Sequence, residues 1–173
     1  MITVTDVENT FSESGNLPYW NNYLVSIGFG NVDTMEQSYF CCQHDTQPKT
    51  PDTFKRVQAI LDTTTLLIGH NIKHDLQWIN AIWKYQGAVY DTMTYEYLKY
   101  NGMPQMYRLS LKECCARRKL PAKKDVTEEY LSKGVGFNAM PWEVVEEYGN
   151  HDVYITMLLY IEQQKELGLW KKK

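Results

Sequence analysis

The first part of the chain has the pattern of apolar and polar residues that is typical of β-strands. Residues 2–7 combine Ile, Val and Val with Thr, Thr and Asp, which predicts a strand with one buried face. Two more β-like runs follow, Tyr23 to Phe29 and Gln37 to Cys42, and a turn rich in Gly, Asn and Asp separates them. Three consecutive strands joined by turns predict an antiparallel meander.

After Pro48 and Pro51 the apolar period becomes helical, and helices then alternate with short strands. This alternation predicts β-α-β units with parallel strands. The first helix is marked by Phe54, Val57, Ile60 and Leu61 and leads to a buried strand at 65–68; the second is marked by Leu76, Ile79, Ile82 and Trp83, closes near Gly87, and leads to a strand at 88–90 that ends at Asp91.

The rest of the chain is predicted to be mainly helical. A helix from about Thr92 to Tyr100 stops near Gly102 and Pro104, and Ser110 with Glu113 forms a capping-box pattern. Residues 119–140 have mixed charge and read as a partly mobile excursion, after which Pro141 starts a helix to about Leu167. The predicted fold class is therefore α/β, with a mixed five-stranded sheet flanked by helices.

The length and composition favour one compact domain over residues 1–173. Hydrophobic residues make up 43% of the 173 residues, which is enough for a sizeable core. No basic start followed by a long apolar stretch resembles a secretory signal, and no apolar run approaches the roughly 20 residues that cross a bilayer. We expect a soluble protein without a membrane partner.

Four cysteines form two adjacent pairs, Cys41-Cys42 and Cys114-Cys115. Adjacent cysteines are poorly placed for ordinary disulfides, so a reducing cytoplasm is expected. A zinc site that joins them with His44 is an alternative, although no C-x2-C spacing supports it. The net charge of −3 argues against gripping a long duplex by charge alone, but a site of several carboxylates is acidic until cations neutralise it.

Three short segments carry the candidate chemistry. Asp6 and Glu8 share one strand face and offer two hard oxygen ligands, although Asp-x-Glu also arises by chance. Asp75 follows a buried strand, where open α/β sheets bind ligands; an ordinary helix start is the alternative. Tyr148 and Asp152 share the inward face of the last helix, where a cation, a salt bridge or a cap would satisfy the carboxylate. Gly149 indicates a close approach by another group.

Together these segments resemble the DEDD (DnaQ-like) 3′→5′ exonucleases, which have an RNase H-like fold. The family motifs Asp-x-Glu, Asn-x3-Asp and Tyr-x3-Asp match Asp6 to Glu8, Asn71 to Asp75 and Tyr148 to Asp152. Glu147 stands where another subfamily has its His, which indicates the tyrosine subclass. His151, although close by, is then not the counterpart of that histidine. Leu24 to Gly28, Tyr90 to Met93 and Leu109 to Leu111 look like the proofreading domain of family A, phage-type DNA polymerases.

The resemblance implies a two-metal phosphodiesterase that acts on single-stranded DNA 3′ ends. Asp6 would bridge two Mg²⁺ or Mn²⁺ ions, Glu8 and Asp152 would complete the first site, and Asp75 would support the second. Tyr148 would orient the attacking water. A DNA polymerase or other replication protein is an expected partner, in the host cytoplasm if the protein is phage-encoded. No polymerase follows, so the chain is a free-standing nuclease or an excised domain.

The substrate contacts are less defined than the ligands. The expected contacts are Asn9 or Thr10 with the terminal sugar, Phe11 as a stacking platform, and Asn71. Further candidates are Tyr19, Trp20 and Phe137 for stacking, and Arg117, Arg118, Lys119, Lys123 and Lys124 for phosphates, although such a charge run is usually a solvated face. An RNA exonuclease or oligoribonuclease remains an alternative. A catalytically inactive binding module on this fold is a second one.

Overall fold

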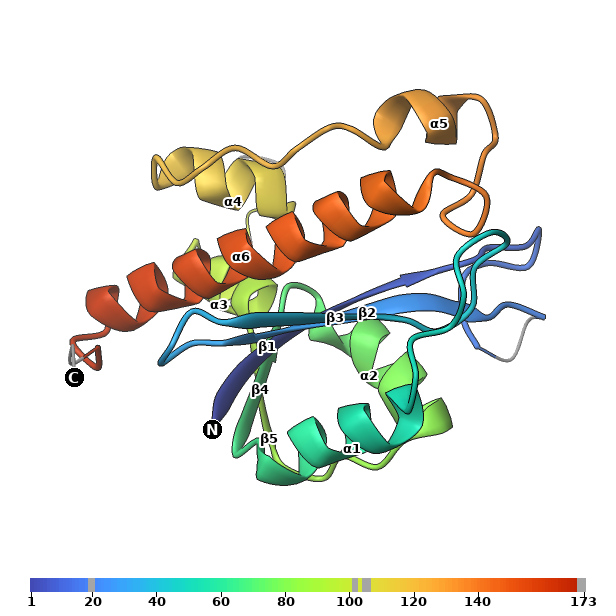
Figure 1. Ribbon diagram of the computed structural model, residues 1–173. Helices are drawn as coiled ribbons and strands as arrows, with labels where there is room; N and C mark the ends of the chain where they lie inside the picture. Colours follow the sequence, from blue (N-terminus) through green and yellow to red (C-terminus); the bar gives the residue numbers. More distant parts are fainter. Residues whose placement is uncertain (19–20, 101–102, 104–106, 171–173) are drawn as a thin grey trace.

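Five strands form a mixed sheet in the order β3-β2-β1-β4-β5. A computed structural model describes residues 1–18, 21–100, 103 and 107–170 (Figure 1). β1, β2 and β3 are antiparallel, whereas β4 and β5 run parallel to β1. The predicted meander and the predicted parallel strands are both confirmed. The strands are β1 (Ile2–Asn9), β2 (Leu24–Asn31), β3 (Gln37–Cys41), β4 (Leu66–Gly69) and β5 (Ala88–Asp91).

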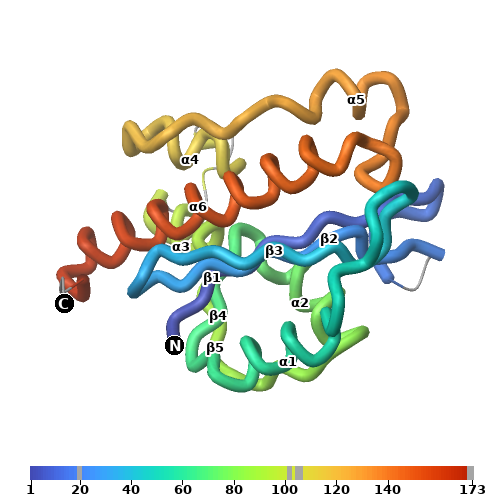
Figure 2. The backbone as a smooth tube through the Cα atoms, viewed as in Figure 1, coloured from blue at the N-terminus to red at the C-terminus, as the bar shows by residue number. Residues whose placement is uncertain are grey.

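Helices cover both faces of this sheet. Figure 1 and the tube in Figure 2 place α1 and α2 against one face and the long α6 across the other, with α4 and α5 on the outer side of α6. The helices are α1 (Thr53–Thr63), α2 (Ile72–Ile82), α3 (Thr92–Lys99), α4 (Leu111–Arg117), α5 (Glu128–Ser132) and α6 (Trp142–Glu166). In the described part of the chain, no helix is both long and apolar enough to cross a bilayer.

β1 contributes to an apolar cluster on each side of the sheet. Val4 is buried with Val153 and Met157 of α6, whereas Val7 is buried with Trp78 and Ile79 of α2. Side chains of a strand point alternately to its two faces, so a strand covered on both faces buries apolar residues on both. This packing fixes the register of β1, and hence the face on which each of its acidic residues lies.

The boundaries differ from the predicted ones where tertiary contacts decide them. β1 continues to Asn9, but β4 pairs with it only through Ile2 to Val4. The acidic end of β1 therefore extends past the carboxyl end of β4. α2 begins at Ile72, so Asp75 lies in its first turn rather than before it. Pro141 is the N-cap of α6 and not its first residue.

Smaller features of the prediction have mixed outcomes. Half of the expected capping box is present, because Ser110 Oγ accepts a hydrogen bond from the Glu113 backbone N–H at 3.3 Å. The stretch 119–140, expected to be a partly mobile excursion, contains the five-residue helix α5. Gly102 and Pro104, where a helix was predicted to stop, lie outside the described residues.

The cysteines are core residues. Cys114 and Cys115 are fully buried with Ile155 and Leu159 of α6, and Cys41 is fully buried as well. All four thiols are free. Within the described residues the metal-ligand types gather into a single group, which contains no cysteine. The zinc alternative is therefore wrong, because the two cysteine pairs pack into separate parts of the core.

Candidate active site

Asp6 and Glu8 lie on the face of the sheet that α6 covers. Asp6 pairs across the strands with Gly28, and a Cβ added to Gly28 would meet Val153 of α6 at 2.9 Å. Directly opposite residues of an antiparallel pair share a face, so Asp6 points toward α6. Glu8, two residues on, points the same way.

α6 brings Asp152 to these two carboxylates. Asp152 is 4% exposed, and Val145, Ile155 and Leu159 on the same helix are fully buried, as the sequence predicts for an inward face. Asp6, Glu8 and Asp152 each place one carboxylate oxygen so that all three oxygens lie within 4.8 Å of one another. The first strand and the last helix of the chain thus meet at one acidic cluster.

Gly149 allows α6 to approach the sheet at this point. The Tyr39 ring of β3 lies against Gly149, and an added Cβ would come within 2.5 Å of Tyr39 Cζ. Tyr39 Oη is held there by Ser26 Oγ at 2.8 Å and by the Val145 carbonyl at 3.3 Å. The close approach that the mid-helix glycine indicates is therefore made by a tyrosine, which spaces α6 above the sheet.

Gly149→Ala is expected to destabilise the fold by about 1–3 kcal/mol, because the added methyl group overpacks a buried contact. Thermal unfolding measures this cost. Tyr39→Leu should remove the clash, so the double variant should lose less than the sum of the two single variants. Additive losses would show that Tyr39 does not set the spacing.

Asp75 lies beside the three-carboxylate cluster but outside it. Asp75 is 4% exposed, and its Oδ1 accepts a hydrogen bond from the Val7 backbone N–H at 3.1 Å. This bond ties the first turn of α2 to β1 between Asp6 and Glu8. The fourth predicted carboxylate is therefore fixed against the backbone of β1, next to the other three.

Burial makes the charged form of these carboxylates unfavourable. It raises the pKa of Asp6 to about 7, with a further contribution from the charge of Asp152. Burial and the neighbouring acidic groups also hold the pKa values of Glu8 and Asp75 well above their usual range. Burial raises the pKa of Asp152 against the opposing effect of Lys123. The cluster is short of positive charge.

The unsatisfied oxygen atoms fit a divalent cation. Asp152 Oδ1 is buried and has no hydrogen-bond partner within the described residues. Hard carboxylate oxygens are the ligands that Mg²⁺ and Mn²⁺ prefer. The only ion pair that the cluster makes with a described residue joins Lys123 Nζ to Asp152 Oδ2, at 2.5 Å.

Tyr148 lies one helical turn before Asp152 and is half-buried. Its ring packs on Phe137, with 5.8 Å between ring centroids, and the Lys123 ammonium lies 4.7 Å from its ring centroid. Burial, with the charges of Asp152 and Glu8, raises the pKa of the Tyr148 phenol. The hydroxyl is therefore neutral at neutral pH and acts as a hydrogen-bonding group.

The predicted substrate residues lie near the end of β1, but several are engaged within the protein. Asn9 binds His74 Nε2 through its Oδ1 at 2.8 Å and donates to two backbone carbonyls. Thr10 Oγ1 accepts from the Tyr23 backbone N–H at 2.9 Å. Phe11 is 55% exposed, and Asn71 is an exposed N-cap of α2. Tyr19 and Trp20 lie outside the described residues.

The basic run divides into two parts with different contacts. Arg117 and Arg118 both pair with the fully buried carboxylate of Glu96, at 3.0 and 2.6 Å, so they hold α3 and α4 together and do not form a free phosphate-binding face. Lys123 pairs with Asp152, and Lys124 pairs with Glu147. Sequence reasoning placed Lys123 in this run but did not connect it with the carboxylates.

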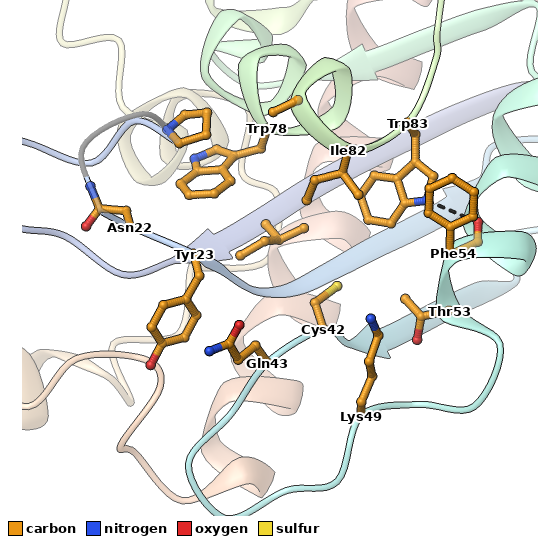
Figure 3. Close-up of a pocket in the computed structure, with 13 residues that line it drawn as sticks. Asn22, Tyr23, Cys42, Gln43, Lys49, Thr53, Phe54, Trp78, Ile82 and Trp83 are labelled. Atoms are coloured by element: carbon orange, nitrogen blue, oxygen red, sulfur yellow. Dashed lines mark hydrogen bonds between the residues drawn. The ribbon is translucent and has the colours of Figure 1, made fainter.

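Two hollows lie on opposite faces of the sheet. One, of about 370 Å³, is lined by Thr10 and Phe11 after β1 and by residues of the loop before α6. The other, of about 340 Å³, lies among Leu24, Trp78 and Trp83 on the side of α1 and α2 (Figure 3). The first is lined by the two residues that directly follow β1, the strand that carries Glu8, so it is the candidate substrate groove.

No family model matches the chain, and neither does any curated protein. Several solved structures share its fold. One described as the apo form of a nuclease is 14% identical with a TM-score of 0.67, over 96% of this chain and 72% of that one. Brucella melitensis NrnC with bound Mg²⁺ is 18% identical with a TM-score of 0.60, over 97% and 75%.

A third similar structure is the Saccharomyces cerevisiae Pan2 pseudoubiquitin hydrolase-RNA exonuclease module in complex with A7 RNA. It is 13% identical with a TM-score of 0.54, over 96% of this chain and 29% of that one. At such identities the likeness shows the fold alone. The chain has the RNase H-like fold of these nucleases, with a mixed five-stranded sheet flanked by helices.

Proposed function

We propose that this protein is a metal-dependent 3′→5′ exonuclease that releases nucleoside monophosphates from single-stranded or frayed DNA ends. The observation that carries the proposal is the convergence of one carboxylate oxygen each from Asp6, Glu8 and Asp152 within 4.8 Å beside α6, with Glu8 and Asp152 buried and Asp6 partly buried. Asp75 is fixed beside them. The fold is that of nucleases, one of them described with bound Mg²⁺.

The four carboxylates would hold two divalent cations, Mg²⁺ or Mn²⁺. Asp6 would serve both ions, Glu8 and Asp152 would complete one site, and Asp75 would support the other. Bound in this way, such ions lower the pKa of a water molecule and stabilise the charge on the leaving oxygen. Asp152 Oδ1 would gain the partner that none of the described residues supplies.

The chain's own groups position the substrate and the water. The groove beside Thr10 and Phe11 is the place for the last nucleotides, with the exposed Phe11 ring as a stacking surface. The Tyr148 hydroxyl, which is neutral at neutral pH as an ordinary phenol is, orients the water by a hydrogen bond and does not take its proton. The 3′ end of the substrate must be unpaired, because α6 covers the carboxylates and a single strand reaches them more easily than a duplex does.

Two observations bear on the sugar. The sequence resemblance to polymerase proofreading domains favours DNA, and with it a DNA polymerase or other replication protein as partner. The Pan2 structure is described as an RNA exonuclease with bound RNA, which makes RNA the second candidate substrate. An inactive binding module is disfavoured, because it has no need for buried carboxylates that raise one another's pKa.

The test of substrate class is digestion of matched single strands of DNA and RNA, each with Mg²⁺, Mn²⁺ or excess chelator. We expect DNA to be shortened faster than RNA in either metal, and neither strand to be shortened in chelator. Faster cleavage of RNA would transfer the proposal to RNA. Equal cleavage in chelator would exclude metal-dependent hydrolysis.

Tyr148→Phe is expected to lower the rate by about 10²- to 10⁴-fold, because it removes one hydrogen bond that positions the water. The affinity for the metal, measured by calorimetry, should equal that of the wild type, since the carboxylates remain. Tyr154→Phe on the exposed side of the same helix is the matched control and should have full activity. A Tyr148→Phe variant that loses its metal would make Tyr148 a structural support of the site.

A further inference from the structure

The ammonium group of Lys123 lies at the carboxylate cluster and not in solvent. Its ammonium group is 2.5 Å from Asp152 Oδ2 and 4.7 Å from the centroid of the Tyr148 ring, and its side chain is 23% exposed. Lysine ammonium groups usually remain in water while their hydrocarbon chains cover apolar surface. This one points instead into the carboxylate cluster, from a segment that has neither helix nor strand.

Contacts on both sides of Lys123 hold that segment against α6. The Ala122 carbonyl is bound by His151 Nε2 at 2.8 Å, and the Lys124 ammonium pairs with Glu147. His151 and Glu147 are each next in sequence to a proposed site residue, Asp152 and Tyr148. α6 therefore fixes Lys123 at the site by the same two turns that carry the site's own side chains.

We propose that Lys123 is a substrate-binding residue whose ammonium group pairs with a non-bridging oxygen of the scissile phosphodiester. The inference rests on the proposed nuclease function. Four ionised carboxylates and two divalent cations sum to zero charge, so the bound phosphodiester adds an uncompensated charge of −1. Lys123 supplies the balancing charge of +1. Charge-assisted hydrogen bonds from ammonium groups to phosphate are among the stronger ones in proteins.

The contact with Asp152 is compatible with this role. Lys123 engages only Oδ2, while Oδ1 of the same carboxylate is buried and without a partner among the described residues. A cation held at Oδ1 would leave the ammonium group at Oδ2 free to contact an oxygen of a phosphate bound beside it. Lys124 is the matched neighbour, because it is 42% exposed and pairs with Glu147, 54% exposed, outside the cluster.

The experiment compares Lys123→Met with Lys124→Met, because methionine keeps most of the hydrocarbon chain and removes only the charge. Binding of a single-stranded DNA is measured in Ca²⁺, a hard cation with the same preference for oxygen ligands, and gels confirm that no strand is cut. Two strands are used, which differ only at the last linkage: a normal phosphodiester or a neutral methylphosphonate. Thermal unfolding and calorimetry with Mg²⁺ report folding and metal binding.

We expect Lys123→Met to weaken binding of the phosphodiester strand by about 10-fold or more and to leave binding of the methylphosphonate strand unchanged. In Lys124→Met the contact of His151 Nε2 with the Ala122 carbonyl still holds the segment, and the lost pair with Glu147 is solvent-exposed and contributes little. This variant should therefore match wild type on both strands, and Mg²⁺ affinity should not fall in either variant. If Lys123→Met does not fold, Lys123→Gln, which can still donate to Asp152, takes its place.

Other results overturn the inference in distinguishable ways. Equal weakening on both strands, or loss of Mg²⁺ binding, would mean that Lys123 only maintains the cluster. Unchanged binding of both strands, with wild-type cleavage intact in Mg²⁺, would remove Lys123 from the site but leave the proposed function standing. A wild-type protein that cleaves neither DNA nor RNA in Mg²⁺ would contradict the proposed function itself.

Discussion

Asp6→Asn is expected to reduce cleavage by about 1,000-fold or more. The substitution keeps the size of the side chain but removes the charge of the residue proposed to serve both metal ions. Several kcal/mol of transition-state stabilisation depend on such ions, and each 1.36 kcal/mol corresponds to a factor of ten in rate. Single-turnover cleavage of a single-stranded DNA in Mg²⁺ measures the loss.

The same substitution should stabilise the metal-free fold at alkaline pH. Asp6 has a folded-state pKa of about 7 against an ordinary value of 3.8. The stability that comes from its protonation is therefore fully present below 3.8 and is lost as the pH rises through about 7. In chelator, the melting temperature of the wild type should fall between pH 5 and 8, and that of Asp6→Asn should fall less.

Asp52→Asn is the matched control for both measurements. Asp52 is exposed at the start of α1 and makes no side-chain capping bond, so its substitution should change neither cleavage nor the pH dependence of melting. If Asp6→Asn kept more than a tenth of the wild-type cleavage rate, Asp6 would not be an essential metal ligand. If it melted at a lower temperature than the wild type at pH 8 in chelator, the charged form of Asp6 would not destabilise the metal-free fold.

Glu96→Ala is expected to cost about 3–5 kcal/mol, the range for breaking a buried ion pair by removing one partner. Glu96 is fully buried and receives hydrogen bonds from Arg117, Arg118 and Gln163. Without it, Arg117 loses its carboxylate partner and Arg118 keeps only Glu166. For a chain of this length the melting temperature should fall by about 6–20 °C, at about 2–4 °C per kcal/mol.

The pH dependence of this network has the opposite sign to that of Asp6. Burial alone would raise the pKa of Glu96, but the hydrogen bonds from Arg118, Arg117 and Gln163 lower it. Its stabilising effect is therefore present above the ordinary pKa of 4.5 and is lost as the pH falls below that value. Glu162→Ala, which breaks the solvent-exposed pair with Lys165, should cost less than about 1 kcal/mol. Equal melting of the two variants would contradict the structural role of Glu96.

The parts that the sequence predicts well are those set by periodicity. Residues 2–7 alternate apolar with polar side chains, residues 23–29 and 37–42 are β-like runs, and the structure has β1, β2 and β3 at these places. The inward position of Asp152 also follows from pattern, since Asp152, Ile155 and Leu159 mark one buried face of a helix, whereas its meeting with Asp6 is implied by the resemblance to the DEDD exonucleases. Nearly the whole candidate ligand set is therefore visible before any coordinates.

The parts that sequence could not give depend on contacts between distant segments. Asn9 is a good candidate for a substrate contact by its place after Glu8, but pairing with His74 engages its side chain. Arg117 and Lys123 belong to one basic run, yet one meets Glu96 and the other Asp152. The course of the backbone over residues 118–127, between α4 and α5, decides which carboxylate each residue reaches. Neither composition nor spacing predicts that course.

The direct test of 3′→5′ exonuclease activity follows one single-stranded DNA carrying either a 3′ or a 5′ label, in Mg²⁺. The 3′ label should be released at once as a mononucleotide, the 5′-labelled strand should shorten stepwise, and chelator or Asp152→Asn should stop both. Release of a 5′ mononucleotide first, cutting of a circular single strand, or undiminished cleavage in chelator would contradict it.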